Sequence, residues 1–417
     1  MEVLQVKKLV KKQNDWRKNC INLIASENVL SPLAQKLLVS DFLSRYNEHG
    51  IKDDKFFEHY QGTKFSSEIE KLCIKIFSKK FKTPYVDVRP ISGVLANLAV
   101  FWATLNPKDT IFVPGLTFGG HISSTKYGAL GIFNLNIVEM PIDKKKLQID
   151  VSKTIELIKK FNPKLILFGR SMFLFPEPIK EIKKHTRAIV VYDAAHVFGL
   201  IFSGFFQDPF KEGVDIITAS THKTFPGPQG GIILANPKID KNIWKKIQYK
   251  IFPGLVSNHH IFRLPSLAIT ALEMEKFGRL YAKKIIENAQ FLAKTLHNFG
   301  FDVLGKNLNF TKSHQIILNV KNFGGGEVVA KKLERANIIL NKMALFDDSP
   351  YDATHNPSGI RIGVQEMTRY GMGKNEMKKI ATFIKRILID KENPEKVKKE
   401  VVAFRKKFQK IKFCFND

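Results

Sequence analysis

Residues 214–223 read Val214-Asp215-Ile216-Ile217-Thr218-Ala219-Ser220-Thr221-His222-Lys223. An apolar run of strand length ends shortly before a lysine, and a second apolar run, 188–192, ends on Asp193. Similar runs stand at 86–88, 111–113, 165–168 and 232–234, and a helical pattern at 150–158 lies between two of them. Buried strands joined by helical crossovers predict an α/β fold with a mainly parallel central sheet and helices on both faces.

Asp193 and Lys223 are expected at the same edge of that sheet, because each follows the carboxyl end of its strand. A lysine amine can hold an aldehyde cofactor as a Schiff base, and a carboxylate can pair with a pyridinium nitrogen. Alone, such a lysine is usually a loop residue and such an aspartate a helix cap. Together they point to pyridoxal 5'-phosphate (PLP).

Two further motifs fit a phosphorylated cofactor and an amino-acid substrate. Ser92-Gly93 follows a strand and opens an apolar helix, whose exposed N–H groups can seat a phosphate. Arg361 follows a turn at 356–359 and could clamp a carboxylate through two hydrogen bonds. Each motif is weak alone, since it also describes an ordinary helix cap or a surface arginine.

The 417 residues and 44% apolar content suffice for two domains. We predict an N-terminal helical arm (1–40), a large PLP-binding domain (41–270) and a smaller C-terminal α+β domain (271–417). The last part shows helical patterns at 266–278, 281–296 and 327–335, with short strands at 316–318 and 338–340.

The formal net charge of +28 is spread along the chain, and we interpret most lysines as solvated helix faces rather than a nucleic-acid site. The densest segment, 396–410, is typical of an amphipathic basic helix with Val401, Val402 and Phe408 as apolar contacts. Three scattered cysteines give neither a disulfide framework nor a zinc spacing. With no apolar run of membrane length and no signal-peptide pattern, we expect a cytoplasmic protein that does not contact membranes.

An ordered set of motifs resembles the serine hydroxymethyltransferases, a branch of the fold type I PLP enzymes. These motifs are Leu23-Ile24-Ala25-Ser26-Glu27-Asn28, Ser92-Gly93 with Asn97, Gly119-Gly120-His121, Asp193-Ala194-Ala195-His196, Thr221-His222-Lys223-Thr224 and Ser358-Gly359-Ile360-Arg361. The similarity covers about residues 15–375. Details such as Gly227-Pro228-Gln229-Gly230-Gly231 are most similar to the archaeal-type branch, which often uses a methanopterin-type carrier instead of folate.

The resemblance implies a fold type I PLP transferase that interconverts serine and glycine and transfers one carbon to a tetrahydropterin. The implied catalytic residues are Lys223, which carries the cofactor as an internal aldimine, Glu48 as acid–base group, His196, Asp193, Tyr46 and His222. The implied cofactor-binding residues are Lys223, Ser92, Gly93, Asp193, His196, Ser171, Thr221 and Phe118. The implied substrate-binding residues are Arg361, Ser26, Tyr46, Glu48 and Tyr60. Tyr46 and Glu48 enter the site from a neighbouring subunit, which implies a homodimer.

The chain departs from that family in three places. Phe118 stands where many members have a polar or imidazole side chain, and Arg170 stands where glycine is common. The segment 49–59 is longer by about four residues than the usual loop, and it is charged. The long loop motivates an alternative: a carrier-independent threonine aldolase or transaldolase acting on β-hydroxy amino acids. A nucleic-acid-binding protein with secondary or absent catalysis is the alternative from another class.

We expect no metal site. His259, His260 and His314 do not form a metal-ligand spacing in the sequence.

Overall fold

The structure is a computed structural model that describes residues 1–52 and 55–416. The chain forms two compact units, which we describe separately. The large unit comprises Asn28–Ala282 with Phe413–Asp417, and the small unit comprises Met1–Glu27 with Lys283–Lys412. The N-terminal segment is thus grouped with the C-terminal half of the chain. The domain limits expected at residues 40 and 270 remain predictions.

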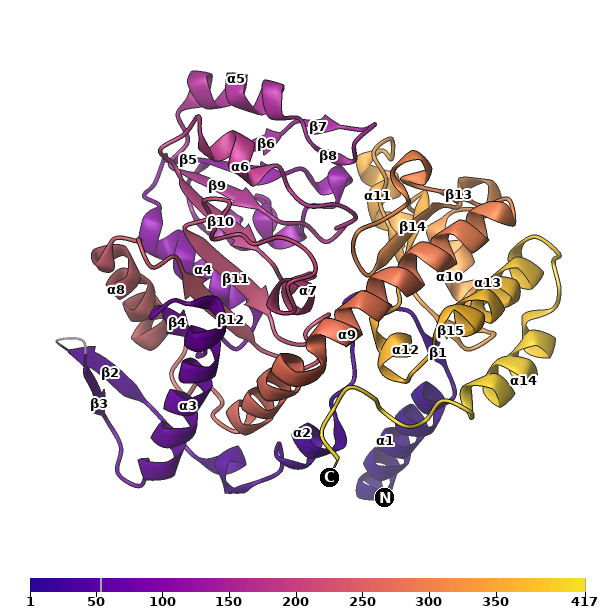
Figure 1. The fold of residues 1–417 in the computed structure, drawn as a ribbon, viewed down its shortest axis with the longest axis horizontal. Helices are drawn as coiled ribbons and strands as arrows, with labels where there is room; N and C mark the ends of the chain where they lie inside the picture. The colour runs from indigo at the N-terminus through magenta and orange to yellow at the C-terminus, as the bar shows by residue number, and fades with distance from the viewer. Residues whose placement is uncertain (53–54, 417) are drawn as a thin grey trace. The chain divides into compact units, whose positions relative to one another are not determined.

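The large unit is built on a seven-stranded sheet (Figure 1). Its strands, in spatial order, are β4 (Val86–Asp87), β12 (Gly231–Ala235), β11 (Ile216–Ser220), β10 (Ile189–Asp193), β9 (Leu165–Phe168), β5 (Thr110–Pro114) and β6 (Asn136–Met140). The five strands from β11 to β6 are parallel, while β12 and β4 pair antiparallel. The predicted α/β class and the mainly parallel sheet are confirmed.

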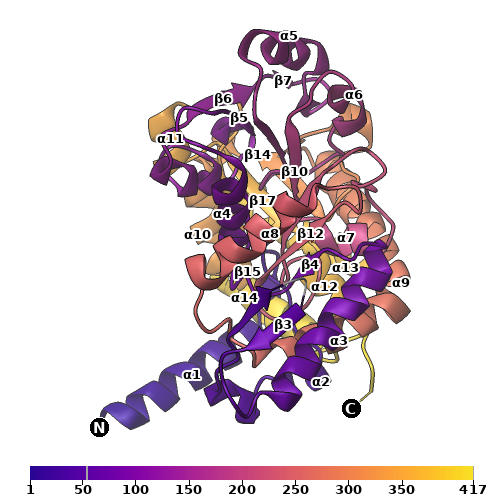
Figure 2. The same ribbon diagram turned by 90° about the vertical axis from the view of Figure 1, so that its left-hand side faces the viewer.

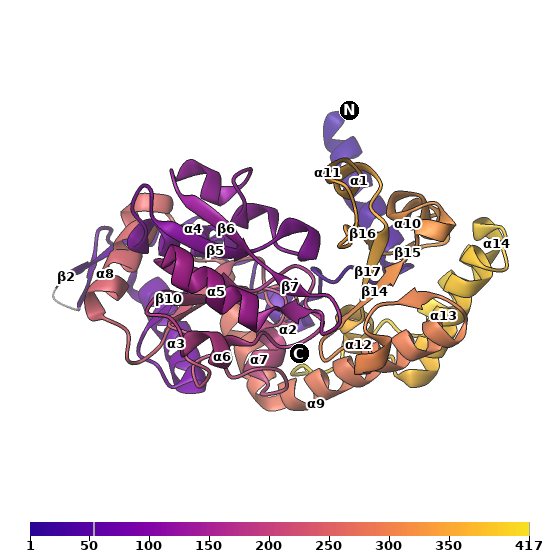
Figure 3. The same cartoon turned by 90° about the horizontal axis from the view of Figure 1, so that it is seen from above.

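Helices cover both faces of this sheet (Figure 3). On one face, α4 (Gly93–Thr104) and α8 (Lys241–Tyr249) pack through a buried cluster that includes Val100, Trp244 and Val191. On the other face, the ring of Phe112 lies 6.5 Å from that of Phe161 in α5 (Val151–Phe161). Alternate residues of each strand therefore pack into two hydrophobic cores, one on each face of the sheet. This explains why the strands appear in the sequence as continuous apolar runs.

The remaining elements of the large unit are short, apart from α3. They are α2 (Pro32–Lys36), the hairpin β2 (His49–Lys52) and β3 (Lys55–Glu58), α3 (Lys64–Phe81), the hairpin β7 (Ile142–Asp143) and β8 (Gln148–Ile149), α6 (Ile179–Lys183) and α7 (Phe198–Phe202). Figures 1 and 2 both show the β2–β3 hairpin beside α3. The long segment that the sequence analysis singled out, 49–59, is thus largely this hairpin; residues 53–54 lie outside the described part.

The small unit has a four-stranded antiparallel sheet ordered β13 (Asp302–Val303), β14 (Gln315–Asn319), β17 (Gly359–Gly363), β16 (Asn341–Met343). A parallel pair, β1 (Ile21–Asn22) with β15 (Ile338–Ile339), joins the N-terminal segment to it. Its helices are α1 (Glu2–Lys18), α10 (Gly326–Glu334), α11 (Pro350–His355), α12 (Gln365–Arg369), α13 (Lys374–Leu388) and α14 (Pro394–Arg405).

One helix, α9 (Arg263–Asn298), replaces the two that the sequence predicted at 266–278 and 281–296. The predicted separation into two helices between residues 278 and 281 is wrong. A Cβ atom built on Gly278 would lie 2.7 Å from the Ser203 hydroxyl, so this glycine allows close packing within a continuous helix.

The basic C-terminal segment is helical, as predicted, but its helix α14 ends at Arg405, before residue 410. Val401 is fully buried and Val402 partly buried in the helix, and Phe408, beyond its end, is partly buried. One of its charged residues, Arg405, makes contacts within the small unit. The Arg405 guanidinium lies 3.9 Å from the centre of the Tyr370 ring, and its Nε donates to the Cys20 carbonyl. Among the described residues, no helix has the length and apolar character needed to cross a membrane.

Candidate active site

Asp193 is the last residue of β10, and a chain of hydrogen bonds fixes its carboxylate. The Asn97 amide donates to Asp193 Oδ2 at 2.7 Å, and the Thr218 hydroxyl donates to Asn97 Oδ1 at 2.5 Å. The backbone N–H of Ala195 donates to Asp193 Oδ1 at 3.0 Å. Because Thr218 occupies one side of the Asn97 amide, the N–H side must face Asp193. The carboxylate is thus held in one orientation.

Lys223 lies three residues beyond β11, in a loop held by its neighbours. The Asn28 amide donates to the Lys223 carbonyl at 2.7 Å, and the Thr221 hydroxyl donates to the Pro228 carbonyl at 2.6 Å. The Thr224 hydroxyl donates to the carbonyl of His196, in the segment that follows Asp193. The loops after β10 and β11 are therefore bonded to each other, and the lysine backbone is fixed at the carboxyl edge that Asp193 also occupies.

Each of these two loops carries a histidine, His196 after β10 and His222 after β11. Burial and the neighbouring Lys223 charge lower the pKa of His222 to about 4, so its ring is neutral at neutral pH. His196 is 3% exposed. His222 can therefore act through hydrogen bonding or ring packing, and not as a cation.

Ser92 is the N-cap of α4, where its hydroxyl accepts a hydrogen bond from the Leu95 N–H. A Cβ atom on Gly93 would lie 2.6 Å from the Ser220 hydroxyl, and one on Gly231 would lie 2.3 Å from the Ser92 carbonyl. These glycines let β11 and β12 approach the first turn of α4. The first turn of α4, where the sequence predicts a phosphate seat, is a helix N-terminus that these two strands approach closely.

Phe118 and Ser171 come from two loops that touch. The Ser171 N–H donates to the Gly119 carbonyl at 2.6 Å, and a Cβ on Gly119, whose φ is +77°, would meet Met172 at 2.2 Å. Phe118 is 2% exposed, and the Arg170 guanidinium lies 4.3 Å from the centre of its ring.

Arg170, which stands where glycine is common in the family, is buried and not a surface residue. Its side chain is 1% exposed, and its Nε donates to Glu177 Oε1 at 2.6 Å. The arginine is thus enclosed between a carboxylate and an aromatic ring, where it supports the loop that carries Ser171.

Tyr46, Glu48 and Tyr60 form a second group in the large unit, around the β2–β3 hairpin. The rings of Tyr46 and Tyr60 are 5.5 Å apart, and both side chains are about half exposed. The Ser257 hydroxyl donates to Glu48, and the Asn258 amide donates to the Arg45 carbonyl. The long segment between Tyr46 and Tyr60 thus leaves the two rings next to each other.

Arg361 and Ser26 belong to the small unit. Arg361 lies on β17 and is 7% exposed; its Nε donates to Asn341 Oδ1 at 3.2 Å, and burial lowers its pKa to about 10. The Gly363 N–H donates to the Leu23 carbonyl, and a Cβ on Gly363 would lie 2.4 Å from Ala25 Cα. The segment that carries Ser26 therefore packs against the end of the strand that carries Arg361.

The structure adds residues that the sequence analysis did not name as site residues. Thr218 and Asn97 orient Asp193, and Asn28 holds the Lys223 backbone. Thr218 could have been singled out in the sequence, since it is a polar residue in an otherwise apolar part of its strand.

The residues of the large unit fit PLP. They provide an oriented carboxylate for the pyridinium nitrogen, a lysine on the adjoining loop, and a glycine-bearing helix N-terminus for the phosphate. This donor set matches the three functional groups of the cofactor.

Comparison with known proteins identifies the family. The sequence model of serine hydroxymethyltransferase matches residues 2–384. The chain belongs to this family. Its relatives include proteins named serine hydroxymethyltransferase from Saccharolobus islandicus (47% identical, covering 100% of this chain and 95% of the relative), Pyrococcus furiosus (47%, 99% and 96%) and Methanocella arvoryzae (48%, 98% and 95%).

A solved structure supports the fold and the cofactor. An L-threonine transaldolase from Pseudomonas fluorescens in its internal aldimine state has a TM-score of 0.90 and 27% identity, covering 99% of this chain and 93% of that one. The chain is thus a fold type I PLP-dependent hydroxymethyltransferase. The transaldolase alternative is not favoured, because that protein is much more distant than the archaeal serine hydroxymethyltransferases.

Proposed function

We propose that this serine hydroxymethyltransferase converts serine to glycine, and the reverse, by passing the one-carbon group to a tetrahydropterin of the methanopterin or folate type. The observation that carries the proposal is the oriented Asp193 carboxylate on the strand next to the one that leads to Lys223. Bound PLP supplies an electron sink for cleavage of the bond between Cα and Cβ of serine.

The chain's own residues prepare this chemistry. Asp193, fixed by Asn97 and Ala195, would keep the pyridine nitrogen protonated without reorganising during the reaction. Lys223 would hold the cofactor covalently between turnovers, with Thr221 fixing the loop. Ser92 and Gly93 would bind the phosphate at the α4 N-terminus. Ser171 and His196 would face the cofactor hydroxyl, and Phe118 would lie against the ring.

Substrate binding falls to other residues. Arg361, with Ser26, would hold the serine carboxylate; its orientation is supported by Asn341. His222, neutral at working pH, would shape the cofactor face near the lysine. Glu48 would exchange protons with the hydroxymethyl group, and Tyr46 and Tyr60 would line the carrier side.

The half-exposed Tyr46 and Tyr60 support a homodimer in which this segment completes the partner's site. Mixing experiments test this arrangement. Lys223→Gln and Glu48→Gln chains should each be inactive alone. In a hybrid dimer one of the two sites keeps both residues, so the hybrid should have about half the activity of the unmodified dimer. A random mixture of equal amounts of the two chains should therefore regain about a quarter of that activity. No recovery after verified subunit exchange would contradict shared sites.

Partners and location follow the same proposal. We infer small-molecule substrates and a cytoplasmic setting, supported by Cys20 and Cys73, which are buried and outside any disulfide. The basic charge is taken up in part by ion pairs such as Arg386 with Glu392 and Glu400, which favours a solvated surface over nucleic-acid binding.

Glycine formation from L-serine by the PLP-loaded protein tests the reaction, measured with tetrahydrofolate, with tetrahydromethanopterin and with no carrier. We expect turnover with at least one carrier to exceed carrier-free turnover by about 100-fold or more, since carrier and acid–base group act together. Cleavage of threonine that is faster than carrier-dependent serine turnover would overturn the proposal.

A further inference from the structure

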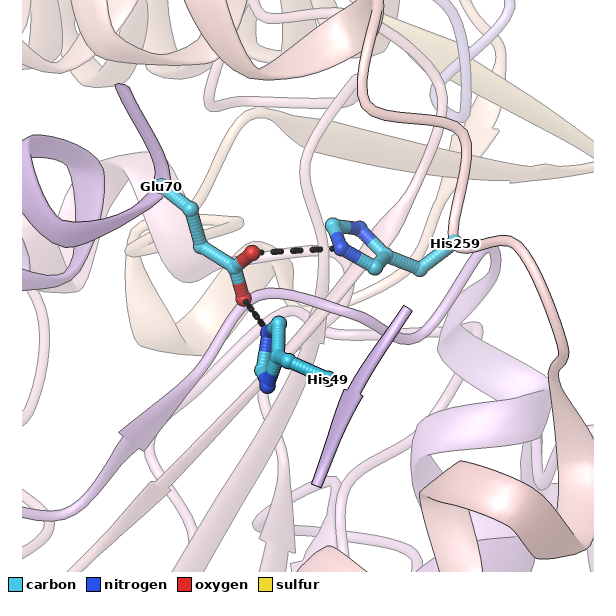
Figure 4. Close-up of side chains that lie close together, drawn as sticks. All are labelled: His49, Glu70 and His259. Atoms are coloured by element: carbon cyan, nitrogen blue, oxygen red, sulfur yellow. Dashed lines mark hydrogen bonds and ion pairs between the residues drawn. The ribbon is translucent and has the colours of Figure 1, made fainter. Parts of the chain in front are cut away.

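The structure brings His49, Glu70 and His259 together inside the large unit (Figure 4). His49 begins β2, Glu70 lies in α3, and His259 lies in the segment before α9. Each of the three residues is at most 3% exposed. We propose that these side chains bind a divalent transition-metal ion of the Zn²⁺ class, a site that the sequence analysis did not expect.

The three side chains form a donor set that suits a transition-metal ion. Two imidazole nitrogens and one carboxylate are ligands that Zn²⁺, Co²⁺ and Ni²⁺ accept, and open positions remain for water. Figure 4 shows both rings directed at the same carboxylate from different elements. Three inward-facing groups of this kind from three separate elements are what a small ion can join.

The ligand atoms of the three residues lie close to one another. One candidate ligand atom from each residue lies within 4.8 Å of the other two. The His49 Nε2 to Glu70 Oε1 distance is 2.9 Å, and the His259 Nε2 to Glu70 Oε2 distance is 3.2 Å. Metal bonds of about 2.0–2.2 Å separate neighbouring ligand atoms by about 3.0–3.4 Å in octahedral and tetrahedral sites. The two histidine–glutamate distances lie close to that range, while the spacing between the two rings is bounded only at 4.8 Å, so any excess there would have to shorten when an ion binds.

Further side chains hold the Glu70 carboxylate in place. The Asn47 amide donates to Glu70 Oε2 at 2.9 Å, and its Oδ1 accepts a hydrogen bond from the Ser66 hydroxyl. Ligating carboxylates are commonly oriented by such outer hydrogen bonds.

A small cavity adjoins the cluster. Its volume is about 10 Å³, and it is lined by His49, Glu58, Ser67, Glu70 and Lys71. This is close to the space that one water molecule needs. A water or the Glu58 carboxylate could therefore complete the coordination.

The consequence of binding would be local. His49 and His259 flank the contact between the Glu48 segment and residues 257–258. An ion held by both histidines would tie the hairpin, α3 and the 257–260 segment together. Its expected role is structural, and it takes no part in the reaction proposed above.

Calorimetric titration of Zn²⁺ into the full PLP-loaded chain, tag-free and stripped with a chelator, tests the site. We expect one tight site per chain. His259→Asn and Glu70→Gln should weaken it by more than the roughly 10–100-fold cost of losing an outer partner. His260→Asn is the matched control, because this histidine is adjacent but lies outside the cluster, and it should bind as the unmodified chain does. No stoichiometric binding, or tight binding that survives His259→Asn, would overturn the proposal.

A second measurement does not depend on the variants folding. Crystals of the unmodified chain soaked in Co²⁺ should show an anomalous peak between the Nε2 atoms of His49 and His259. Direct hydrogen bonds between both rings and Glu70, with no peak there, would show that the cluster is only a buried polar network.

Discussion

Replacing Asn97 by alanine should impair catalysis, and it should also lower stability by about 1–3 kcal/mol, the cost of leaving a buried hydroxyl unpaired. The change removes the 2.7 Å hydrogen bond to Asp193 and leaves the Thr218 hydroxyl, which is 0% exposed, without its acceptor. A hydrogen bond to a charged group contributes about 1.5–3 kcal/mol. At 1.36 kcal/mol per factor of ten, this corresponds to a loss of roughly 10–150-fold. Asp193 keeps the Ala195 N–H, so PLP should still bind, but more weakly.

The assay is kcat/KM for serine-dependent glycine formation at saturating PLP, with Tm measured beside it. Thr218→Val should cost less, about 10-fold, because Asp193 keeps its hydrogen bond while the Asn97 amide loses its orientation. Asn136→Ala is the matched control, since Asn136 also bonds a threonine, Thr110, but on the far edge of the sheet. Activity of Asn97→Ala within twofold of the unmodified chain would refute the proposed role of this relay.

Three further predictions follow from single contacts. Arg170→Met should lower stability by about 3–5 kcal/mol, measured by urea unfolding, because it leaves Glu177 buried without its partner; a loss below 1 kcal/mol would show that the pair is not needed. Arg361→Ala should raise KM for serine at least about 100-fold with a smaller change in PLP affinity, since a carboxylate clamp would be lost; equal losses in both would contradict a substrate role. Burial raises the pKa of Glu366 from 4.5 to about 7, so the free energy of unfolding should fall by up to roughly 3 kcal/mol as pH rises from about 4.5 past 7. Glu366→Gln should flatten this dependence of Tm on pH. An unchanged dependence would show that Glu366 does not cause it.

Much of the large unit could be predicted from local pattern. The runs at 165–168 and 232–234 lie in β9 and β12, because strands buried on both faces must be continuously apolar. Asp193 and Lys223 could be placed at one edge, since parallel strands end on the same side. The continuous α9 could not, because Gly278 is a helix breaker in isolation and only its close approach to Ser203 explains it.

The finer features of the site depend on tertiary contacts. Nothing local indicates that Asn97 and Thr218, 121 residues apart, orient Asp193. The burial of Arg170 depends on Glu177 and Phe118, which belong to different loops. No ligand motif in the sequence indicates the cluster of His49, Glu70 and His259, because its members are far apart in the chain and come from three elements.

The central claim is that Lys223, among the many lysines of this basic chain, holds PLP at the edge of the sheet beside Asp193. Borohydride reduction of the PLP-loaded protein followed by peptide mass mapping tests it directly. We predict one pyridoxyl group per chain, located on Lys223 and absent when the protein is saturated with serine before reduction. Modification of another lysine under the same conditions, or none at all, would contradict the account.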